Sequence, residues 1–172
     1  MTPPMRPEAQ FGVRMHQLLK SVHQMLRDDL AACRELAAEV AAGAPAARIA
    51  EAITALQSRS PIWTLRVNCL YHCRHVHLHH RIEDADMFPA LRRSNPELSA
   101  VVDRLEADHR AISTLLDEVQ ACAEHLDDAA ASSERARLVR ALTDLADRLL
   151  EHLAYEEEAV APAMRSWEYW PV

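Results

Sequence analysis

The sequence contains very little glycine and few aromatic residues. Only two of its 172 residues are Gly, and aromatic side chains make up 5% of the chain. Tight turns and strand bends depend on glycine, so its scarcity argues against an all-β fold. The shortage of aromatic and β-branched runs disfavours strands in the same way. The length suits one domain with a sizeable core, and the composition favours an all-α fold.

The sequence also lacks a basic block and a long apolar run. The formal net charge is −7 and Lys and Arg do not cluster, which disfavours a nucleic-acid partner. No apolar run approaches the roughly 20 residues that span a membrane, and the first ten residues contain no segment of signal-peptide type. We therefore expect a cytoplasmic protein with no membrane partner.

The four cysteines do not form a known metal motif. Cys33, Cys69, Cys73 and Cys122 match neither a CxxC pair nor a zinc ribbon. In a cytosolic helical protein such residues are typically small buried apolar side chains. A redox role for Cys33, Cys69 and Cys73 stays open.

Apolar residues at spacings of three and four predict four long helices. These helices span residues 10–42, 61–92, 96–126 and 134–166, with a short connecting helix over 47–57. Ser60-Pro61 and Asn95-Pro96 are typical helix starts, and Ser132 or Ser133 is the expected cap of the last helix. Pro89 is expected to bend or fray the second helix and Pro162 to interrupt the fourth.

Short connections make sequential helices antiparallel. The expected architecture is therefore an up-down-up-down four-helix bundle with a short extra helix between helices one and two. We expect residues 1–9 to be disordered, residues 10–166 to form the bundle, and residues 167–172 to form a C-terminal tail that packs on one end of it.

Histidine is present in excess. The chain has ten histidines, and five of them lie between positions 72 and 80. In the second and fourth predicted helices a histidine is followed four residues later by a glutamate: His79 by Glu83, and His152 by Glu156. Residues four apart lie on one face of a helix. Each pair therefore offers an imidazole nitrogen and a carboxylate to one point in space.

The other two long helices each carry a histidine among apolar residues, His23 and His109. In an antiparallel bundle these four histidines can occupy one layer, and Glu83 and Glu156 then point toward the same end. Buried unpaired carboxylates are costly, so such a set predicts bound cations, and mixed imidazole and carboxylate ligands suit iron or manganese better than structural zinc. The alternative, exposed helix faces, requires four helices to carry this pattern without a common site.

The pattern resembles the hemerythrin-like domains with a His-His-Glu signature. Those domains have a lone histidine in helix one, His-x-x-x-Glu ahead of Phe-Pro in helix two, a histidine in helix three, and His-x-x-x-Glu in helix four. The resemblance covers about residues 10–165, with Phe88-Pro89 and Asp108-His109 at the matching places. It implies an oxo- or hydroxo-bridged pair of irons that meets oxygen, with the ligands His23, His79, Glu83, His109, His152 and Glu156.

Another class of four-helix di-iron proteins uses Glu-x-x-His motifs. Glu106 with His109 is the single clean instance of that spacing here. A ferritin-like site would require the motif on two helices, so this class is disfavoured.

The chain departs from the oxygen-carrying hemerythrins in helix three. Those proteins have a second histidine one turn after the first, where this chain has Ser113. The resemblance then implies an imidazole-poor iron, held from helices three and four, with an extra vacant or water-filled position. His80 could compensate as an additional ligand, or lie at a helix interface, because helical geometry turns it ~100° away from His79.

Three other residues are expected near the centre. Asp108 could orient a ligand from outside the metal's own coordination shell. His72 and His75 could line the mouth of the pocket together with Ser113, on the side away from the carboxylates. Boundary positions at the edge of the core are the alternative for both histidines.

These features predict a non-haem di-iron protein that binds and reduces dioxygen or peroxide, with oxidase- or peroxidase-type activity. Two iron ions are the expected cofactor, ahead of manganese or zinc. A second vacancy favours redox turnover over reversible oxygen carriage. Two other functions stay open: a non-catalytic sensor or store of oxygen, nitric oxide or iron, and an oxygenase that acts on an organic substrate.

Overall fold

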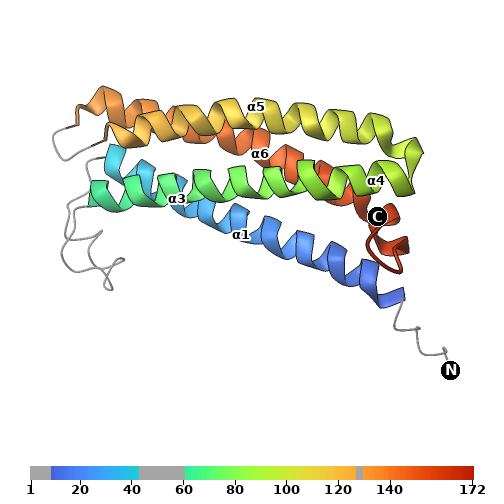
Figure 1. Cartoon of the computed structure of the whole chain (residues 1–172). Helices are drawn as coiled ribbons and strands as arrows, with labels where there is room; N and C mark the ends of the chain where they lie inside the picture. Colours follow the sequence, from blue (N-terminus) through green and yellow to red (C-terminus); the bar gives the residue numbers. More distant parts are fainter. Residues whose placement is uncertain (1–8, 43–60, 127–129) are drawn as a thin grey trace.

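The computed structural model describes residues 9–42, 61–126 and 130–172 (Figure 1). Within these ranges all regular structure is helical, as the composition predicts. The long helices are α1 (Ala9–Ala41), α3 (Pro61–Ile82), α5 (Ser99–Glu124) and α6 (Ser132–Ser166). The short helix expected over 47–57 and the expected disorder of residues 1–8 fall outside the described ranges. None of the described helices is both long and apolar enough to cross a membrane.

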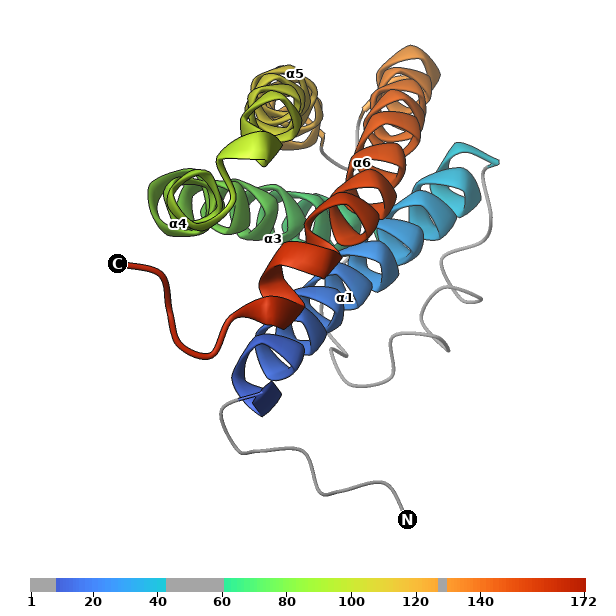
Figure 2. The same cartoon turned by 90° about the vertical axis from the view of Figure 1, so that its right-hand side faces the viewer.

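The four long helices pack antiparallel in the order of the chain (Figures 1 and 2). α1 contacts α3 and α6, and α5 contacts the same two helices from the opposite side. Each helix therefore has its sequence neighbours beside it, and α6 closes the ring against α1. The predicted up-down-up-down bundle is confirmed.

The second predicted helix contains an unpredicted π-helical turn. α3 ends at Ile82, a π-helix follows over Glu83–Met87, and α4 runs from Phe88 to Ser94. The N–H of Phe88 donates to the carbonyl oxygen of Glu83, five residues back. In a regular α-helix Phe88 would lie about 140° around the axis from Glu83. The π turn instead brings Phe88 into the core, where it is fully buried.

The predicted fraying at Pro89 and the predicted interruption at Pro162 differ from the structure. Pro89 lies in the first turn of α4, directly after the π turn, and α4 continues to Ser94. α6 continues through Pro162 to Ser166, so the predicted interruption is wrong. Pro162 lies on the exposed side of α6, where water can satisfy the carbonyl oxygen that loses its N–H partner.

The expected cap of the last helix is also wrong. α6 begins at Ser132, and Ala131 is the N-cap residue. The N–H of Ala131 donates to the carboxylate of Glu134 at 2.8 Å, which takes over half of a capping box. A hydroxyl at the cap is therefore not needed here.

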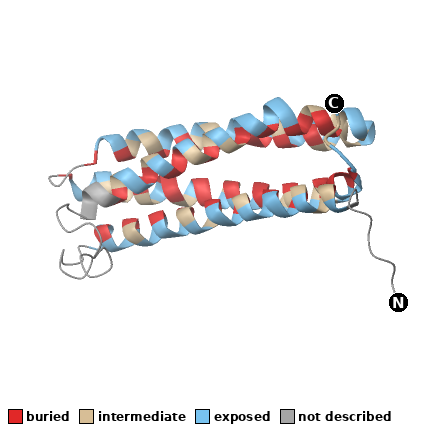
Figure 3. Cartoon of the chain, turned by 60° about the horizontal axis from the view of Figure 1, so that its bottom comes forward, coloured by how far each residue is buried: buried red, intermediate tan, exposed pale blue. Residues whose placement is uncertain are grey.

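Buried residues recur along each helix (Figure 3), and they form two apolar clusters along the bundle axis. The larger cluster, in one half of the bundle, includes Leu30, Leu65, Leu116 and Leu142. The smaller one surrounds Phe88 and includes Leu105, Val160, Met164 and Trp167 from the C-terminal segment. Trp167 thus anchors the tail on one end of the bundle, as expected.

The cysteines fit their expected role as small apolar side chains. Cys33, Cys69 and Cys73 are buried in the larger cluster, and Cys122 is half-buried beside it. Burial raises the pKa of the Cys73 thiol to about 12. A thiol in this environment is protonated and unreactive at neutral pH.

Gly12 allows α1 to approach the end of α6. Its N–H donates to the carbonyl oxygen of Trp167 at 3.0 Å, and a Cβ at this position would overlap the carbonyl oxygen of Met164. We expect Gly12→Ala to lower the free energy of unfolding in urea by ~1–3 kcal/mol, because backbone must shift to admit the methyl group. The control Ser21→Ala, on the exposed side of α1, should change it by less than ~0.5 kcal/mol. Equal stability of the two variants would contradict this packing argument.

Candidate metal centre

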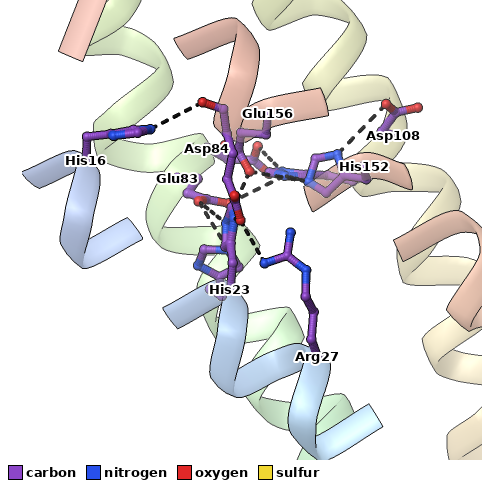
Figure 4. Close-up of polar contacts among 11 residues, drawn as sticks. His16, His23, Arg27, Glu83, Asp84, Asp108, His152 and Glu156 are labelled. Atoms are coloured by element: carbon purple, nitrogen blue, oxygen red, sulfur yellow. Dashed lines mark hydrogen bonds and ion pairs between the residues drawn. The ribbon is translucent and has the colours of Figure 1, made fainter. Parts of the chain in front are cut away.

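A layer of buried imidazoles and carboxylates separates the two apolar clusters. Its side chains come from all four long helices and from the π turn, and they form two groups. Within each group the candidate ligand atoms lie within 4.8 Å of one another. The first group is His23, His79, Glu83 and Glu156, and the second is His80, His109 and His152. Figure 4 shows His23, His152 and the two glutamates pointing toward one another.

The two glutamates lie between the groups. Glu83 places Oε1 3.2 Å from Nε2 of His79 and Oε2 3.5 Å from Nε2 of His109. Glu156 places Oε2 3.4 Å from Nε2 of His23 and 3.6 Å from Nε2 of His152. Each carboxylate therefore faces one imidazole of each group.

Carboxylates outside the layer fix the protons of two imidazoles. Nδ1 of His23 lies 3.0 Å from Glu157 Oε1, and Nδ1 of His109 lies 2.8 Å from Asp84 Oδ1. A carboxylate accepts hydrogen bonds, so both Nδ1 atoms carry the proton. In the neutral rings Nε2 is then an unprotonated lone pair, and it points into the layer.

Those lone pairs converge on other imidazole nitrogens. Nε2 of His23 lies 3.0 Å from Nε2 of His79, and Nε2 of His109 lies 3.1 Å from Nε2 of His152. Burial, as the largest cause, lowers the pKa of His23 and of His109 to about 2, and of His79 and of His152 to about 4. All four rings are therefore neutral near pH 7, which is the form that binds metals.

The carboxylates provide a test of whether a cation fits. Both oxygens of Glu83 and both oxygens of Glu156 are buried without a hydrogen-bond partner among the described residues. Burial raises the pKa of Glu156 to about 8, and burial together with the charge of Glu156 raises the pKa of Glu83 well above its ordinary range. Leaving such groups unpaired costs several kcal/mol. Bound cations would satisfy all four oxygens, so the residues present fit a metal.

His80 joins the second group. Its ring stacks on His109 with centroids 3.9 Å apart and an interplanar angle of 10°, and its Nε2 is buried without a hydrogen-bond partner among the described residues. His79 faces α1 and His80 faces α5 and α6, as their angular separation on α3 requires. The group held largely from α5 and α6 thus contains three imidazoles. If His80 binds the metal, this group is the richer in imidazoles, whereas the sequence led us to expect it to be the poorer one.

Asp108 lies near His152 and not near His109, which follows it in the chain. Its carboxylate pairs with the guanidinium of Arg148, and its Oδ2 lies 3.8 Å from Nδ1 of His152. That separation is too long for a direct hydrogen bond. The residue that orients His109 is instead Asp84.

The orienting residues Asp84 and Glu157 were not predicted from the sequence. Each directly follows one of the two central glutamates, and Glu157 is held in turn by Arg27 at 2.8 Å. Figure 4 shows Arg27 one turn after His23 on α1. The pairs Glu83-Asp84 and Glu156-Glu157 could have indicated these orienting residues in the sequence. The residue that follows an inward-facing ligand on a helix can point toward the neighbouring helix.

The remaining expected residues lie outside both groups. His72 is buried, and neither ring nitrogen has a hydrogen-bond partner among the described residues; burial lowers its pKa to about 4. His75 is half-buried, with its ring 3.8 Å from that of Tyr71, and it lines a groove on the outer side of α3. Ser113 is half-buried on α5, one turn after His109.

The fold and this layer define a class: an antiparallel four-helix bundle with buried histidines and glutamates arranged to hold cations. Residues 14–164 match the family model described as the Hemerythrin HHE cation binding domain, and the chain belongs to this family. The searches of curated proteins and of solved structures found no match.

The contact between Glu157 and His23 leads to a prediction on metal retention. Glu157→Gln removes the charge that holds the proton on Nδ1 of His23, and we expect the affinity for the metal to fall ~10–100-fold. Competition with a chelator, followed by elemental analysis, measures this change. Glu158→Gln is the matched control, because Glu158 is the exposed neighbour of Glu157. Equal retention by the two variants would contradict the orienting role, and circular dichroism should show unchanged helix content in both.

Proposed function

We propose that this chain is a non-haem di-iron protein that binds and reduces dioxygen or peroxide. The observation that carries the proposal is the sharing of Glu83 and Glu156 between two groups of imidazoles, with all four carboxylate oxygens buried and unpartnered among the described residues. Shared carboxylates suit a pair of cations better than a single one. Imidazole and carboxylate ligands favour iron, with manganese or zinc as weaker candidates.

The residues that would hold the pair divide by group. One cation would be held by His23 and His79, the other by His80, His109 and His152, and both by Glu83 and Glu156. When bound, the irons would supply the redox chemistry, which no side chain of this layer can perform alone.

The protein's own contribution is to prepare the ligands and exclude water. Glu157 and Asp84 keep protons on the Nδ1 atoms of His23 and His109, so that Nε2 faces inward unprotonated. The raised pKa of Glu156 means that its carboxyl group holds a proton near neutral pH without metal and releases it when a cation binds. The apolar clusters on both sides of the layer restrict access of bulk water.

Metal analysis tests the identity of the centre. Protein purified from iron-replete cells is expected to contain two irons per chain, and the oxidised form should absorb in the near-ultraviolet as oxygen-bridged ferric pairs do. Glu83→Gln combined with Glu156→Gln should abolish both signals, whereas Glu158→Gln should leave both unchanged. One zinc per chain with no iron would overturn the proposal.

Reactivity with oxygen separates reduction from carriage. We expect protein reduced without air and then exposed to oxygen to return to the oxidised spectrum within seconds to minutes, because the proposed pair of irons would offer two redox centres to one oxygen molecule. An oxygen electrode and a stopped-flow spectrophotometer measure the consumption and the rate. Protein that holds its oxygen for hours and releases it under vacuum would indicate storage or transport instead.

A further inference from the structure

The helix α3 differs in charge from the other three long helices. Its 22 residues include Arg66, Arg74, Arg81 and five histidines, but no Asp or Glu. The whole chain has a formal net charge of −7, and α1, α5 and α6 each carry several acidic residues. Acidic residues resume only beyond its end, in the π turn that begins at Glu83. Among the four long helices, only α3 therefore carries a net positive charge.

The outer face of α3 is also apolar. Val67, Tyr71, Leu78 and Ile82 are 38%, 56%, 53% and 53% exposed. Their spacings of four, seven and four residues place them in one stripe along the helix. A groove of about 730 Å³ follows this stripe. The exposure of these four side chains shows that no described helix packs over them.

Two arginines border the stripe. Arg74 and Arg81 are both exposed and line the groove, and they are seven residues apart, so they lie on the same side of α3. Neither makes an ion pair with another described residue, unlike Arg27, Arg92 and Arg148 elsewhere on the surface. None of the residues that line the groove is acidic, although Asp117 of α5 pairs with His77, which does line it. Such a cationic and apolar face suits a partner with acidic side chains around a small apolar patch.

The same helix supplies both groups of the metal centre. Leu78 and Arg81, on the outer face, flank His79 and His80 in the chain, and these histidines belong to the first and second group. Only a few backbone bonds therefore separate the outer face of α3 from each of the two groups. A redox partner that docks on this face would lie close to the centre.

We propose that the outer face of α3 docks an acidic one-electron carrier protein, which supplies the electrons for the reduction. This inference rests on the proposed function. Reduction of one hydrogen peroxide breaks the O–O bond and forms two waters, which takes two electrons and two protons. Two reduced carrier molecules each lose one electron in succession, and solvent supplies the protons.

The charge pattern favours this occupant over a second copy of the chain. A symmetric pair of α3 helices would bring Arg74 and Arg81 of both copies together without an acidic residue of α3 to offset them. Electron-transfer complexes have small interfaces and dissociate quickly, which suits a short stripe of four apolar residues. Opposite charges raise the rate of encounter more than the affinity, as a turnover partner requires.

The experiment measures how fast a reduced acidic plant-type [2Fe–2S] ferredoxin reduces the oxidised iron-loaded protein in a stopped-flow instrument. At low ionic strength we expect Arg74→Glu/Arg81→Glu to lower the second-order rate by ~10-fold or more. The control Arg137→Glu/Arg140→Glu makes the same change of charge at exposed positions of α6 and should keep the wild-type rate. Salt should slow the wild-type reaction and have little effect on the α3 variant.

Dithionite and lipid vesicles separate the remaining outcomes. Dithionite needs no docking surface, so it should reduce wild-type and both variants equally. Wild-type protein that dithionite cannot reduce would refute the proposed function itself. Equal loss of ferredoxin rate in both variants, or an unchanged rate in the α3 variant, would overturn the docking proposal. Binding to phosphatidylserine vesicles through Arg74 and Arg81, with the ferredoxin rate unchanged, would assign this face to a membrane surface instead.

Discussion

Removal of the metal is expected to leave a protein that is most stable near pH 6.5 and that loses stability on both sides. The reason is that the central layer holds groups whose pKa values shift in opposite directions. Burial raises the pKa of Glu156 from 4.5 to about 8, and lowers the pKa of His79 from 6.5 to about 4. Each shift makes the free energy of unfolding depend on pH in its own range.

The alkaline side comes from the carboxylates. Between pH 4.5 and 8 the folded protein keeps the proton on Glu156, whereas the unfolded chain has released it. The unfolded state then binds fewer protons, so the free energy of unfolding falls as the pH rises. Glu83 contributes in the same direction. The combined loss between pH 6.5 and 8 should be on the order of a few kcal/mol.

The acidic side comes from the imidazoles. Below pH 6.5 these histidines bind protons in the unfolded chain but stay neutral in the folded protein. The reason is that burial lowers the pKa of His23 and His109 to about 2 and of His79 and His152 to about 4. The free energy of unfolding therefore falls as the pH drops. Between pH 4.5 and 6.5 these imidazoles outnumber the two carboxylates, so the net effect there is a rise with pH.

Bound metal should remove the alkaline decline and raise the stability. Cations stabilise the ionised carboxylates and add their binding free energy to that of folding. Urea unfolding of chelated and iron-loaded protein from pH 5 to 9 measures both effects, and the loaded form should melt many degrees higher. In the metal-free Glu83→Gln/Glu156→Gln variant the alkaline decline should vanish, while Glu158→Gln should keep it. A metal-free protein as stable as the loaded one, with no decline above pH 6.5, would contradict a core centre.

Periodicity predicted those parts of the centre that depend on a single helix. His79 with Glu83 and His152 with Glu156 could be identified because residues four apart share a face regardless of what surrounds the helix. The four-helix architecture followed in the same way from apolar residues at spacings of three and four. Both depend on local geometry, which the sequence specifies directly.

Contacts between helices could not be predicted in this way. Asp84 reaches His109 and Glu157 reaches His23 because of how α3, α5, α6 and α1 are rotated about their axes. That rotation results from the packing of the whole core. The π turn at Glu83–Met87 is a further case, because its extra residue is accommodated to bury Phe88 and leaves no clear periodic signal.

Replacing His80 of α3 by alanine and, at the same time, Ser113 of α5 by histidine is expected to preserve the metal centre. His80 belongs to the group of His109 and His152, and its Nε2 has no hydrogen-bond partner among the described residues. We expect His80→Ala to lower the affinity of that group for its metal by ~10-fold or more, so that dilute protein retains closer to one iron than two. His77→Ala is the matched control, because it removes a histidine of α3 that pairs with Asp117 at 3.5 Å outside the layer.

Ser113 provides the position for the rescue. It lies four residues after His109 on α5 and is half-buried, so an imidazole there would point toward the same group. His80→Ala/Ser113→His should therefore regain the second iron and the near-ultraviolet absorption of the wild type. Ser113→His alone should change the rate of oxidation by oxygen only slightly, because three imidazoles already occupy that group.

The rescue distinguishes a ligand from a packing residue. His80 also stacks on His109, so His80→Ala could weaken metal binding merely by loosening that ring. His80→Phe keeps the stacked ring and lacks the nitrogen, and it should lose the second iron as His80→Ala does. Elemental analysis after gel filtration and the visible spectrum measure the outcome for each variant. If His80→Phe keeps two irons with an unchanged spectrum, His80 contributes packing alone, and the second group has two imidazoles and a vacant position.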